Sequence, residues 1–353
     1  MSASKVIKIG EHHVGQDYPP FIIAEMSGNH NQSLDRALQI VDAAAAAGAH
    51  AVKLQTYTAD SMTLDVAEGE FLIQDEKSLW RGRTLYDLYE EAHTPWEWHE
   101  AIFQRCRELG VECFSSPFDA KAVDFLEELG APAYKIASFE NVDLPLIERV
   151  AQTGKPLIIS TGMVTVAELG DAVQAARNAG CEELILLKCT SNYPASPANS
   201  NLLTIPHMRD MFGVQIGLSD HTLGIGVPVA SVALGATLVE KHFTLSREEG
   251  GVDSAFSLEP HELQALVDES ERAWQAIGQV SYGPTPDEVA SLKFRRSLYI
   301  TQDLTAGAVL TAKNVRAIRP GLGLSPKELK RVLGMRLTQP AKRGTPITWE
   351  LLK

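Results

Sequence analysis

The sequence of 353 residues has no uninterrupted apolar run that approaches the roughly 18 residues needed to cross a bilayer. Its first residues carry charges and lack the apolar core of about 7–15 residues that typifies a signal peptide, so we expect a cytoplasmic protein with no membrane partner. Cysteine is scarce and shows no Cys-x-x-Cys spacing. We therefore predict reduced, buried and structural thiols at Cys106, Cys113, Cys181 and Cys189.

Positive charge is also in short supply, with 32 Lys and Arg against 45 Asp and Glu and a formal net charge of −13. Proteins that bind nucleic acid present clustered positive charge to phosphate, so this balance argues against a nucleic-acid partner. An anionic substrate would have to be bound by a few local lysines. The length allows one large domain and one small domain.

Eight short β-rich runs alternate with longer helical patterns. Such alternation implies parallel strands joined by right-handed crossovers, and eight repeats predict a closed (β/α)8 TIM barrel. A doubly wound open sheet is the alternative, because strand order cannot be read from this pattern. The strand-like runs are FIIAE (21–25), AVKLQ (51–55), ECFSS (112–116), AYKIA (133–137), PLIIS (156–160), LILLKC (184–189), VQIGLS (214–219) and TLVEKH (237–242). The expected helices cover residues 34–47, 96–109, 123–129, 144–151, 166–179, 227–234 and 262–277.

The composition changes after residue 277 to GQVSYGPTPDEVASLK, whose Gly and Pro residues indicate a linker. The rest of the chain has the short strand-like runs SLYIT and VRAIRP, separated by turns. We therefore predict a barrel at 1–280, a linker at 281–292 and a small, mainly β domain at 293–353.

Two of the loops that should follow barrel strands are unusually long, at residues 56–94 and 190–205. Loops at this end of a TIM barrel build the active site. The first loop has two interpretations, a lid or sugar platform and an extra surface helix. Its aromatic and basic residues are Trp80, Arg81, Arg83, Tyr86 and Tyr89.

Polar residues stand at the C-terminal ends of the predicted strands, which is where a TIM barrel contacts its substrate. A set this large predicts a polar active site. Its members are Glu25, Lys53, Gln55, Ser115, Ser116, Lys135, Ser138, Thr161, Ser191, Ser219, Asp220, His221, Glu240 and His242.

His221 and His242 end two neighbouring strands of this prediction. Adjacent strands lie about 4.8 Å apart, so two imidazoles at equal height can bind one metal ion and leave positions open for water and substrate. A hydrogen-bonded pair of structural histidines is the alternative.

Lys53 and Lys135 end the second and fourth strands. They either pack their stems on the wall with solvated heads, or join the nearby serines in a cradle for phosphate or carboxylate. Glu25 is either a general base or a partner for Lys53, and the sequence does not decide between these roles.

These residues lie in segments through which the chain resembles the sialic acid synthase family over nearly its whole length. The branch of that family that makes pseudaminic acid is the most similar. The similarity rests on the aromatic segment 80–98 and on the short motifs SFE (138–140) and FSL (256–258). The matching segments are AEMSGNHN (24–31), VKLQTYTAD (52–60), LWRGRTLYDLYEEAHTPWEWH (79–99), CFSSPF (113–118), YKIASFE (134–140), LLKCTSNYP (186–194), GLSDHTLG (217–224), EKHFTL (240–245) and SAFSL (254–258), with RSLY and RPGLGL (319–324) in an antifreeze-like (SAF) domain.

The resemblance implies a role for each matching residue. His221 and His242 would bind Mn²⁺, or Mg²⁺ or Co²⁺, and Glu25 would position or activate water. The residues implied to hold phosphoenolpyruvate are Lys53, Ser116, Lys135, Ser138, Ser191 and Ser219. Those implied near the sugar are Gln55, Glu140, Tyr193 and Asp253, with Arg319 delivered from the small domain.

The reaction that the resemblance implies joins phosphoenolpyruvate to 2,4-diacetamido-2,4,6-trideoxy-L-altrose and water, giving pseudaminic acid and phosphate. A synthase of N-acetylneuraminic or legionaminic acid is the alternative within the family, and a carbohydrate-binding protein is the alternative without catalysis. The resemblance also implies a domain-swapped homodimer in which each small domain covers the partner's active site.

Overall fold

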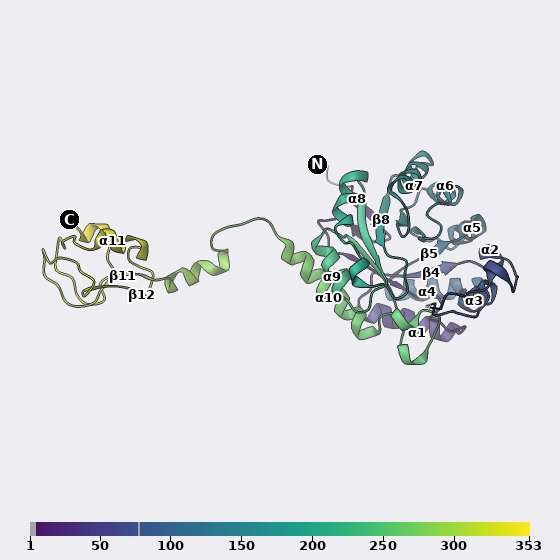
Figure 1. The fold of residues 1–353 in the computed structure, drawn as a ribbon, viewed down its shortest axis with the longest axis horizontal. Coiled ribbons are helices and arrows are strands. Elements are labelled where there is room, and N and C mark those ends of the chain that lie inside the picture. The colour runs from purple at the N-terminus through teal and green to yellow at the C-terminus, as the bar shows by residue number, and fades with distance from the viewer. Residues whose placement is uncertain (1–4, 77) are drawn as a thin grey trace. The chain divides into compact units, whose positions relative to one another are not determined.

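A computed structural model describes residues 5–76 and 78–353, and the chain divides into two compact units, Met1–Gly278 and Gln279–Lys353 (Figure 1). The predicted boundaries at 280 and 292 stay predictions. None of the helices in the described part of the chain has both the length and the apolar character needed to cross a bilayer.

Eight parallel strands form a closed barrel in the first unit. Each strand pairs with its neighbour in sequence, and the last strand pairs with the first, which confirms the predicted barrel and excludes the open sheet. The strands are β3 (Phe21–Glu25), β4 (Ala51–Thr56), β5 (Glu112–Pro117), β6 (Tyr134–Ile136), β7 (Leu157–Ser160), β8 (Leu184–Cys189), β9 (Gln215–Asp220) and β10 (Leu238–His242).

Helices surround this barrel, as Figure 1 shows. They are α1 (Leu34–Ala46), α4 (His99–Leu109), α5 (Ala120–Glu128), α6 (Leu144–Ala151), α7 (Val166–Asn178), α8 (Thr204–Phe212), α9 (Gly226–Ala233) and α10 (Pro260–Ile277). All were predicted except α8. That helix follows Leu203, which offers no side-chain cap, and carries Pro206 in its first turn, so the usual starting signal is missing.

The interior of the barrel is apolar at the N-terminal ends of its strands. There Phe21, Ile23, Phe114 and Leu238 pack with Ile7, Ile9 and Val14 of an N-terminal hairpin, which the sequence analysis missed. The hairpin consists of β1 (Ile7–Ile9) and β2 (His12–Val14), paired antiparallel. Because apolar side chains fill this end, a substrate is expected at the opposite end, where the polar residues lie.

The long segment between β4 and α4 contains α2 (Ala59–Met62) and α3 (Leu85–Ala92). Thr84 caps α3 by accepting a hydrogen bond from the backbone N–H of Asp87. A bridge between Leu72 and Thr84 ties the two arms of the segment together. The expectation of an extra helix is therefore correct for residues 85–92.

The second unit has its own core around a two-stranded antiparallel sheet, β11 (Ser297–Ile300) and β12 (Val315–Ile318). Leu298 and Ile300 of β11 and Val315 of β12 are buried in that core. The short α11 (Leu329–Val332) packs against it through Val332. The predicted linker contains most of a 3-10 helix, Pro286–Phe294. The unit is small and mainly β, as predicted.

Gly217 offers a test of the tight packing between β9 and its neighbours. A Cβ at this position would lie 2.5 Å from the carbonyl oxygen of Leu238 and 2.7 Å from Cδ2 of Leu187. We expect Gly217→Ala to lower the free energy of unfolding by roughly 1–3 kcal/mol in urea denaturation, because the backbone must shift.

Gly170 in α7 is the matched control, since a Cβ there would meet no atom within 4 Å. Gly170→Ala should raise the free energy of unfolding by about 0.5–1 kcal/mol, through the lower backbone entropy of the unfolded chain. Equal stability of the two variants would contradict the close approach at Gly217.

Candidate functional site

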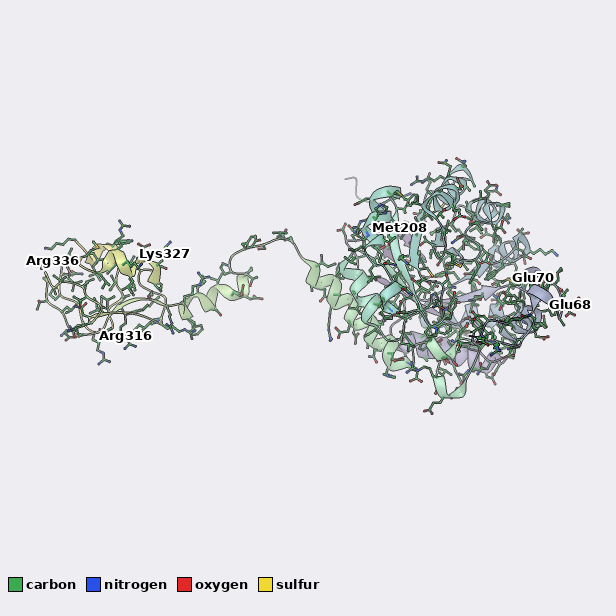
Figure 2. All side chains as sticks on the ribbon, in the orientation of Figure 1. Glu68, Glu70, Met208, Arg316, Lys327 and Arg336 are labelled. Carbon is green, nitrogen blue, oxygen red and sulfur yellow. The ribbon has the colours of Figure 1, made fainter. Side chains whose placement is uncertain are left out.

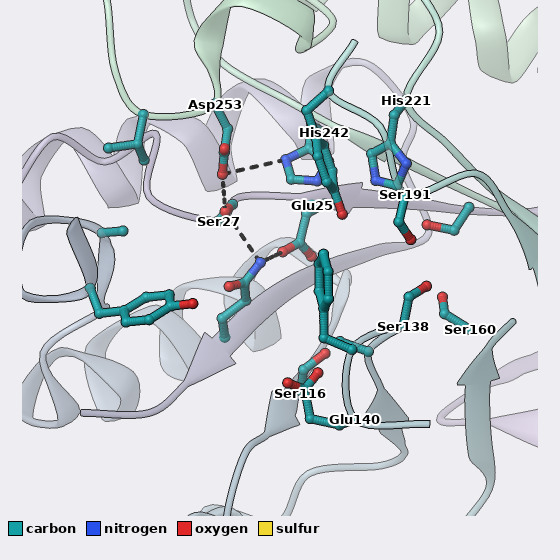
Figure 3. A pocket seen from close by; sticks show the side chains of 18 of the residues that line it. Glu25, Ser27, Ser116, Ser138, Glu140, Ser160, Ser191, His221, His242 and Asp253 are labelled. Atoms are coloured by element: carbon teal, nitrogen blue, oxygen red, sulfur yellow. Dashed lines mark hydrogen bonds and ion pairs between the residues drawn. The ribbon is translucent and has the colours of Figure 1, made fainter. Parts of the chain in front are cut away.

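A cavity of about 510 Å³ opens at the C-terminal ends of the barrel strands. Figure 3 shows residues of several strands that face it. Arg319 belongs to the other unit. The predicted site residues that line the cavity are Glu25, Lys53, Gln55, Ser116, Lys135, Ser138, Glu140, Ser191, Tyr193, Ser219, His221, His242 and Asp253.

Three of the polar strand-end residues do not line this cavity. Ser115 Oγ lies 2.6 Å from Thr56 Oγ1, Thr161 donates to a backbone carbonyl of β8, and Asp220 pairs with Lys241. Successive side chains of a strand point to opposite faces, so only every second residue can face the interior. The expectation that these three face a substrate is therefore wrong.

The two lysines have buried ammonium groups, each beside a carboxylate. Lys53 pairs with Glu25 and donates to Ser116 Oγ at 3.3 Å, while Lys135 Nζ lies 2.8 Å from Glu240 Oε1. The side chains of Lys53 and Lys135 are 2% and 7% exposed. Solvated heads are thus excluded, and the pairing of Glu25 with Lys53 is confirmed.

The pKa values of the two carboxyl groups at this centre, Glu240 and Glu25, are shifted in opposite directions. Burial raises the pKa of Glu240, but attraction by Lys135 and Lys53 outweighs it and lowers that pKa to about 2. For Glu25, burial outweighs the attraction of Lys53 and raises the pKa. Burial lowers the pKa of Lys135, but Glu240 and Glu25 together raise it, so its ammonium stays charged. This centre can therefore attract an anion.

His221 and His242 lie side by side, with ring centroids 5.3 Å apart. His221 Nδ1 lies 3.1 Å from the carbonyl oxygen of Thr190, so a proton on Nδ1 is donated there and Nε2 keeps its lone pair. Burial, followed by the charges of His221 and Lys53, holds the pKa of His242 well below its usual value, and its Nδ1 has no hydrogen-bond partner. Two adjacent imidazoles of this kind fit a divalent metal ion.

No third His, Cys, Asp or Glu within the described residues completes a compact group with these imidazoles. The single compact group of that kind in this part of the chain is at the start of α10, around Glu259, His261 and Glu262. There Arg247 pairs with both glutamates. A metal ion at His221 and His242 would therefore complete its coordination with water and substrate.

A chain of polar contacts runs along the wall from Glu25 to His242. Gln55 Nε2 donates to Glu25 Oε1 at 2.8 Å and to Ser27 Oγ at 3.2 Å, and Ser27 donates to Asp253. Asp253 Oδ2 lies 3.8 Å from His242 Nδ1, as Figure 3 shows. The sequence analysis missed Ser27, because it lies beyond β3 in a turn with a positive φ of 47°.

Cys189 also lines the cavity, at the end of β8. All four cysteines are free and buried, as predicted. The Sγ of Cys189 lies 3.6 Å from Ser191 Oγ and 3.9 Å from His221 Nδ1. Burial raises the pKa of this thiol, but the hydrogen bond and charge of His221 outweigh burial and lower the pKa to about 7. Cys189 is two residues after Leu187, which faces the barrel interior, so the alternation of side chains along β8 could have predicted that Cys189 also faces inward.

The segment between β4 and α4 forms one wall of the cavity. Trp80 Nε1 donates to the carbonyl oxygen of Val252 at 3.1 Å, and the ring of Trp80 lies 6.2 Å from that of Tyr193. The lid or platform interpretation is thus consistent with Trp80 and Tyr89, while Arg81, Arg83 and Tyr86 lie outside the cavity. Other wall residues from this segment are Tyr57, Met62, Ile73, Asp75, Ser78, Leu85, Leu88 and Ala92.

Profiles of two families match the chain, the NeuB family over residues 40–282 and the SAF domain over residues 295–353. A pseudaminic acid synthase of Helicobacter pylori is 43% identical over 94% of this chain and 97% of its own. An N,N'-diacetyllegionaminic acid synthase of Legionella pneumophila is 36% identical over 95% of both chains. The crystal structure of an N-acetylneuraminic acid synthetase of Leptospira borgpetersenii has a TM-score of 0.73 and 32% identity, covering 83% of this chain and 96% of that one.

Glu140 in this cavity gives a prediction for the effect of pH on stability. Burial, only partly opposed by Lys135, raises its pKa from 4.5 to about 7, and its Oε2 has no hydrogen-bond partner. The folded state thus binds this proton more tightly than the unfolded state. The resulting stabilisation is complete below pH 4.5 and is lost as the pH rises through 7.

Glu140→Gln should therefore gain stability relative to the wild type between pH 5 and 8, by an amount on the order of 3 kcal/mol. Urea denaturation at several pH values measures the difference. Ser138→Ala alters the same cavity without removing a titratable group and should keep the wild-type slope. Parallel curves for wild type and Glu140→Gln would disprove the raised pKa.

Proposed function

Because the chain belongs to the NeuB family, we propose that it condenses phosphoenolpyruvate with 2,4-diacetamido-2,4,6-trideoxy-L-altrose and water, giving pseudaminic acid and phosphate. The observation that carries the proposal is one cavity lined by two buried lysines and two adjacent imidazoles. The identity of 43% to a pseudaminic acid synthase supports the choice of sugar. The substrates are small molecules, and we place the reaction in the cytoplasm.

In this proposal, phosphoenolpyruvate binds at the buried lysines. Lys53 and Lys135 attract its phosphate and carboxylate, and surrounding hydroxyl groups donate hydrogen bonds to the same oxygens. The closeness of Lys53 Nζ to Ser116 Oγ supports this grouping. The hydroxyl groups are those of Ser116, Ser138, Ser191 and Ser219, which line the cavity.

His221 and His242 are proposed to hold a divalent ion, with Mn²⁺ as the first choice and Mg²⁺ or Co²⁺ as alternatives. When bound, such an ion polarises the aldehyde oxygen of the open-chain sugar. C3 of phosphoenolpyruvate forms a bond to the aldehyde carbon, and water adds at C2. Glu25 accepts a proton from this water, since its raised pKa suits a general base. The C2–O bond to phosphate then breaks, phosphate leaves with the electron pair, and the C2 hydroxyl loses its proton as the C2 carbonyl forms. The former aldehyde oxygen, whose π bond to carbon was broken by the attack of C3, takes up the proton that Glu25 accepted.

The wall between β4 and α4 supports a sugar with few hydroxyl groups. Ile73, Leu85, Leu88 and Trp80 present apolar surface to the cavity beside the polar side chains of Asp75 and Ser78, and buried apolar surface rejects unpaired hydroxyls. A deoxy methyl group and acetamido methyl groups fit such a wall. Legionaminic acid synthesis is the second candidate, supported by the 36% identical relative. The polar ends of the sugar would contact Gln55, Glu140, Tyr193 and Asp253.

Phosphate release from phosphoenolpyruvate with a panel of sugars tests this function. We expect the highest kcat/KM with 2,4-diacetamido-2,4,6-trideoxy-L-altrose, a lower value with its D-manno isomer and the lowest with N-acetylmannosamine. No phosphate should form without a sugar. A preference for N-acetylmannosamine would exclude the proposed sugar, and no turnover with any sugar would favour a carbohydrate-binding protein.

Trp80→Ala serves as the matched variant in the same assay. Removal of this apolar wall should lower the preference for the deoxy sugar over N-acetylmannosamine by roughly 10–100-fold, the range for apolar discrimination of small groups. Trp349→Ala, in the other unit, removes an indole that is 39% exposed and should leave the preference unchanged.

We further propose a homodimer in which the small unit of each chain covers the partner's cavity. Residues 279–353 carry 13 Lys and Arg against 5 Asp and Glu, so the negative charge of the whole chain resides in the barrel. Figure 2 labels Arg316, Lys327 and Arg336 on the small unit, and Glu68 and Glu70 on the β4–α4 segment. Opposite charges of this kind would guide the two units together.

Arg319 would be the residue that the small unit brings to the partner's sugar. It is exposed at the end of β12 and has no ion pair among the described residues. Co-expression of His221→Ala with Arg319→Ala tests the exchange. Each variant alone should be inactive, while a mixed dimer with exchanged units has one cavity with both residues intact and should regain activity.

The yield of mixed dimers must be measured by mass, for example with a size tag on one chain. Activity that stays at the level of the separate variants, despite mixed dimers, would mean that each small unit serves its own barrel. A monomer in solution would exclude the homodimer directly.

A further inference from the structure

Lys241 is a fully buried cation that the proposed reaction does not use. It precedes His242 on β10, and its side chain is 0% exposed and points away from the cavity toward the layer of helices. Val239 on the same face of β10 and Phe243 directly after the strand belong to the apolar core between barrel and helices. An ammonium group at this place interrupts a row of apolar side chains.

The partners of Lys241 are Asp220, the last residue of β9, and Thr222, two residues farther along, so they stand on both sides of His221. Its Nζ lies 2.9 Å from Asp220 Oδ2 and also donates to the carbonyl oxygen of Thr222. Asp220 in turn accepts from the Thr222 hydroxyl at 2.8 Å and from the Thr222 N–H at 3.3 Å. Lys241 and Asp220 are also register partners in the β9–β10 ladder.

These contacts hold the two residues on either side of His221. Asp220 and Thr222 precede and follow His221, and both are held by the same ammonium group. Lys241 directly precedes His242 in the chain. The contacts of its side chain therefore also hold the strand end that carries the second imidazole. A shift of either strand end would break the contacts of Lys241, and its buried charge would then lack compensation.

We propose that Lys241 and Asp220 are positioning residues that hold His221 and His242 at one height for metal binding. A buried ion pair seldom stabilises a fold more than apolar side chains of the same volume do. Stability alone therefore gives no reason for a charge between Val239 and Phe243. Two imidazoles must meet one ion with bonds of about 2 Å, so a small displacement of either ring separates them from a common ligand position.

The proposal rests on the metal site proposed above, so its test measures metal binding directly. Titration calorimetry with Mn²⁺ gives the dissociation constant of the purified full-length protein, and thermal unfolding without metal gives Tm. We expect Lys241→Met to raise the dissociation constant by about 10–100-fold, the usual effect of removing a group that orients metal ligands. Lys241→Arg keeps the charge and should restore part of the affinity.

Thr56→Val is the matched control. Thr56 is a buried polar residue at the end of β4, where its Oγ1 lies 2.6 Å from Ser115 Oγ and 2.9 Å from His99 Nε2. This variant also breaks a buried polar network between barrel and helices, yet it contacts neither metal-binding strand end. It should lower Tm and leave the dissociation constant for Mn²⁺ unchanged.

The outcomes separate the two proposals. A lower Tm for Lys241→Met with wild-type affinity for Mn²⁺ would show that the pair is merely structural and overturn the positioning role. If Lys241→Met does not fold, Asp220→Asn, which keeps the shape of the side chain, answers the same question. No binding of Mn²⁺ by the wild type would overturn both the positioning role and the metal site, whereas the sugar assay above tests the reaction separately.

Discussion

The alternation of side chains along a closed ring of strands is the constraint on which the rest of this structure depends. Each strand of the barrel sends every second residue inward, and the ring leaves no edge at which a strand could turn over. Along β10, Leu238 fills the apolar end, Glu240 reaches the charged centre and His242 reaches the mouth. Val239, Lys241 and Phe243 face the helices. One strand thus supplies core, site and support in fixed order.

The same closure determines how charge can be buried. Lys53 and Lys135 come from different strands, and each meets a carboxylate from another strand of the barrel, so neither buried cation lacks a counter-charge. The two pairs are unequal, because Glu240 is held ionised while the pKa of Glu25 is raised. An arriving anion therefore meets two ammonium groups whose charge the ionised Glu240 balances only in part.

Much of this arrangement could be predicted from the sequence. The predictions were wrong or missing where the alternation of apolar and polar residues does not indicate the position of a side chain. All eight strands were predicted, because β-rich runs bounded by turns are local features. The directions of Ser115, Thr161 and Asp220 were wrong, since the end of a strand does not reveal which of two successive residues faces inward. Ser27 was missed because it lies in a turn. The N-terminal hairpin was missed because its partners are brought together only when the barrel closes.

The proposed tasks of the site are divided between the barrel strands and a loop segment. The groups proposed to act on phosphoenolpyruvate and metal, such as Lys135 and His242, stand on or next to strands whose register is fixed by neighbours on both sides. The wall proposed to select the sugar comes from the β4–α4 segment, which the hydrogen bond from Trp80 to Val252 joins to the segment after β10. Substitutions in that segment can change the shape of the wall without shifting the barrel. The names of two relatives, a pseudaminic acid synthase at 43% identity and an N,N'-diacetyllegionaminic acid synthase at 36%, differ in the sugar acid, and a variable wall beside a fixed barrel accommodates such a difference.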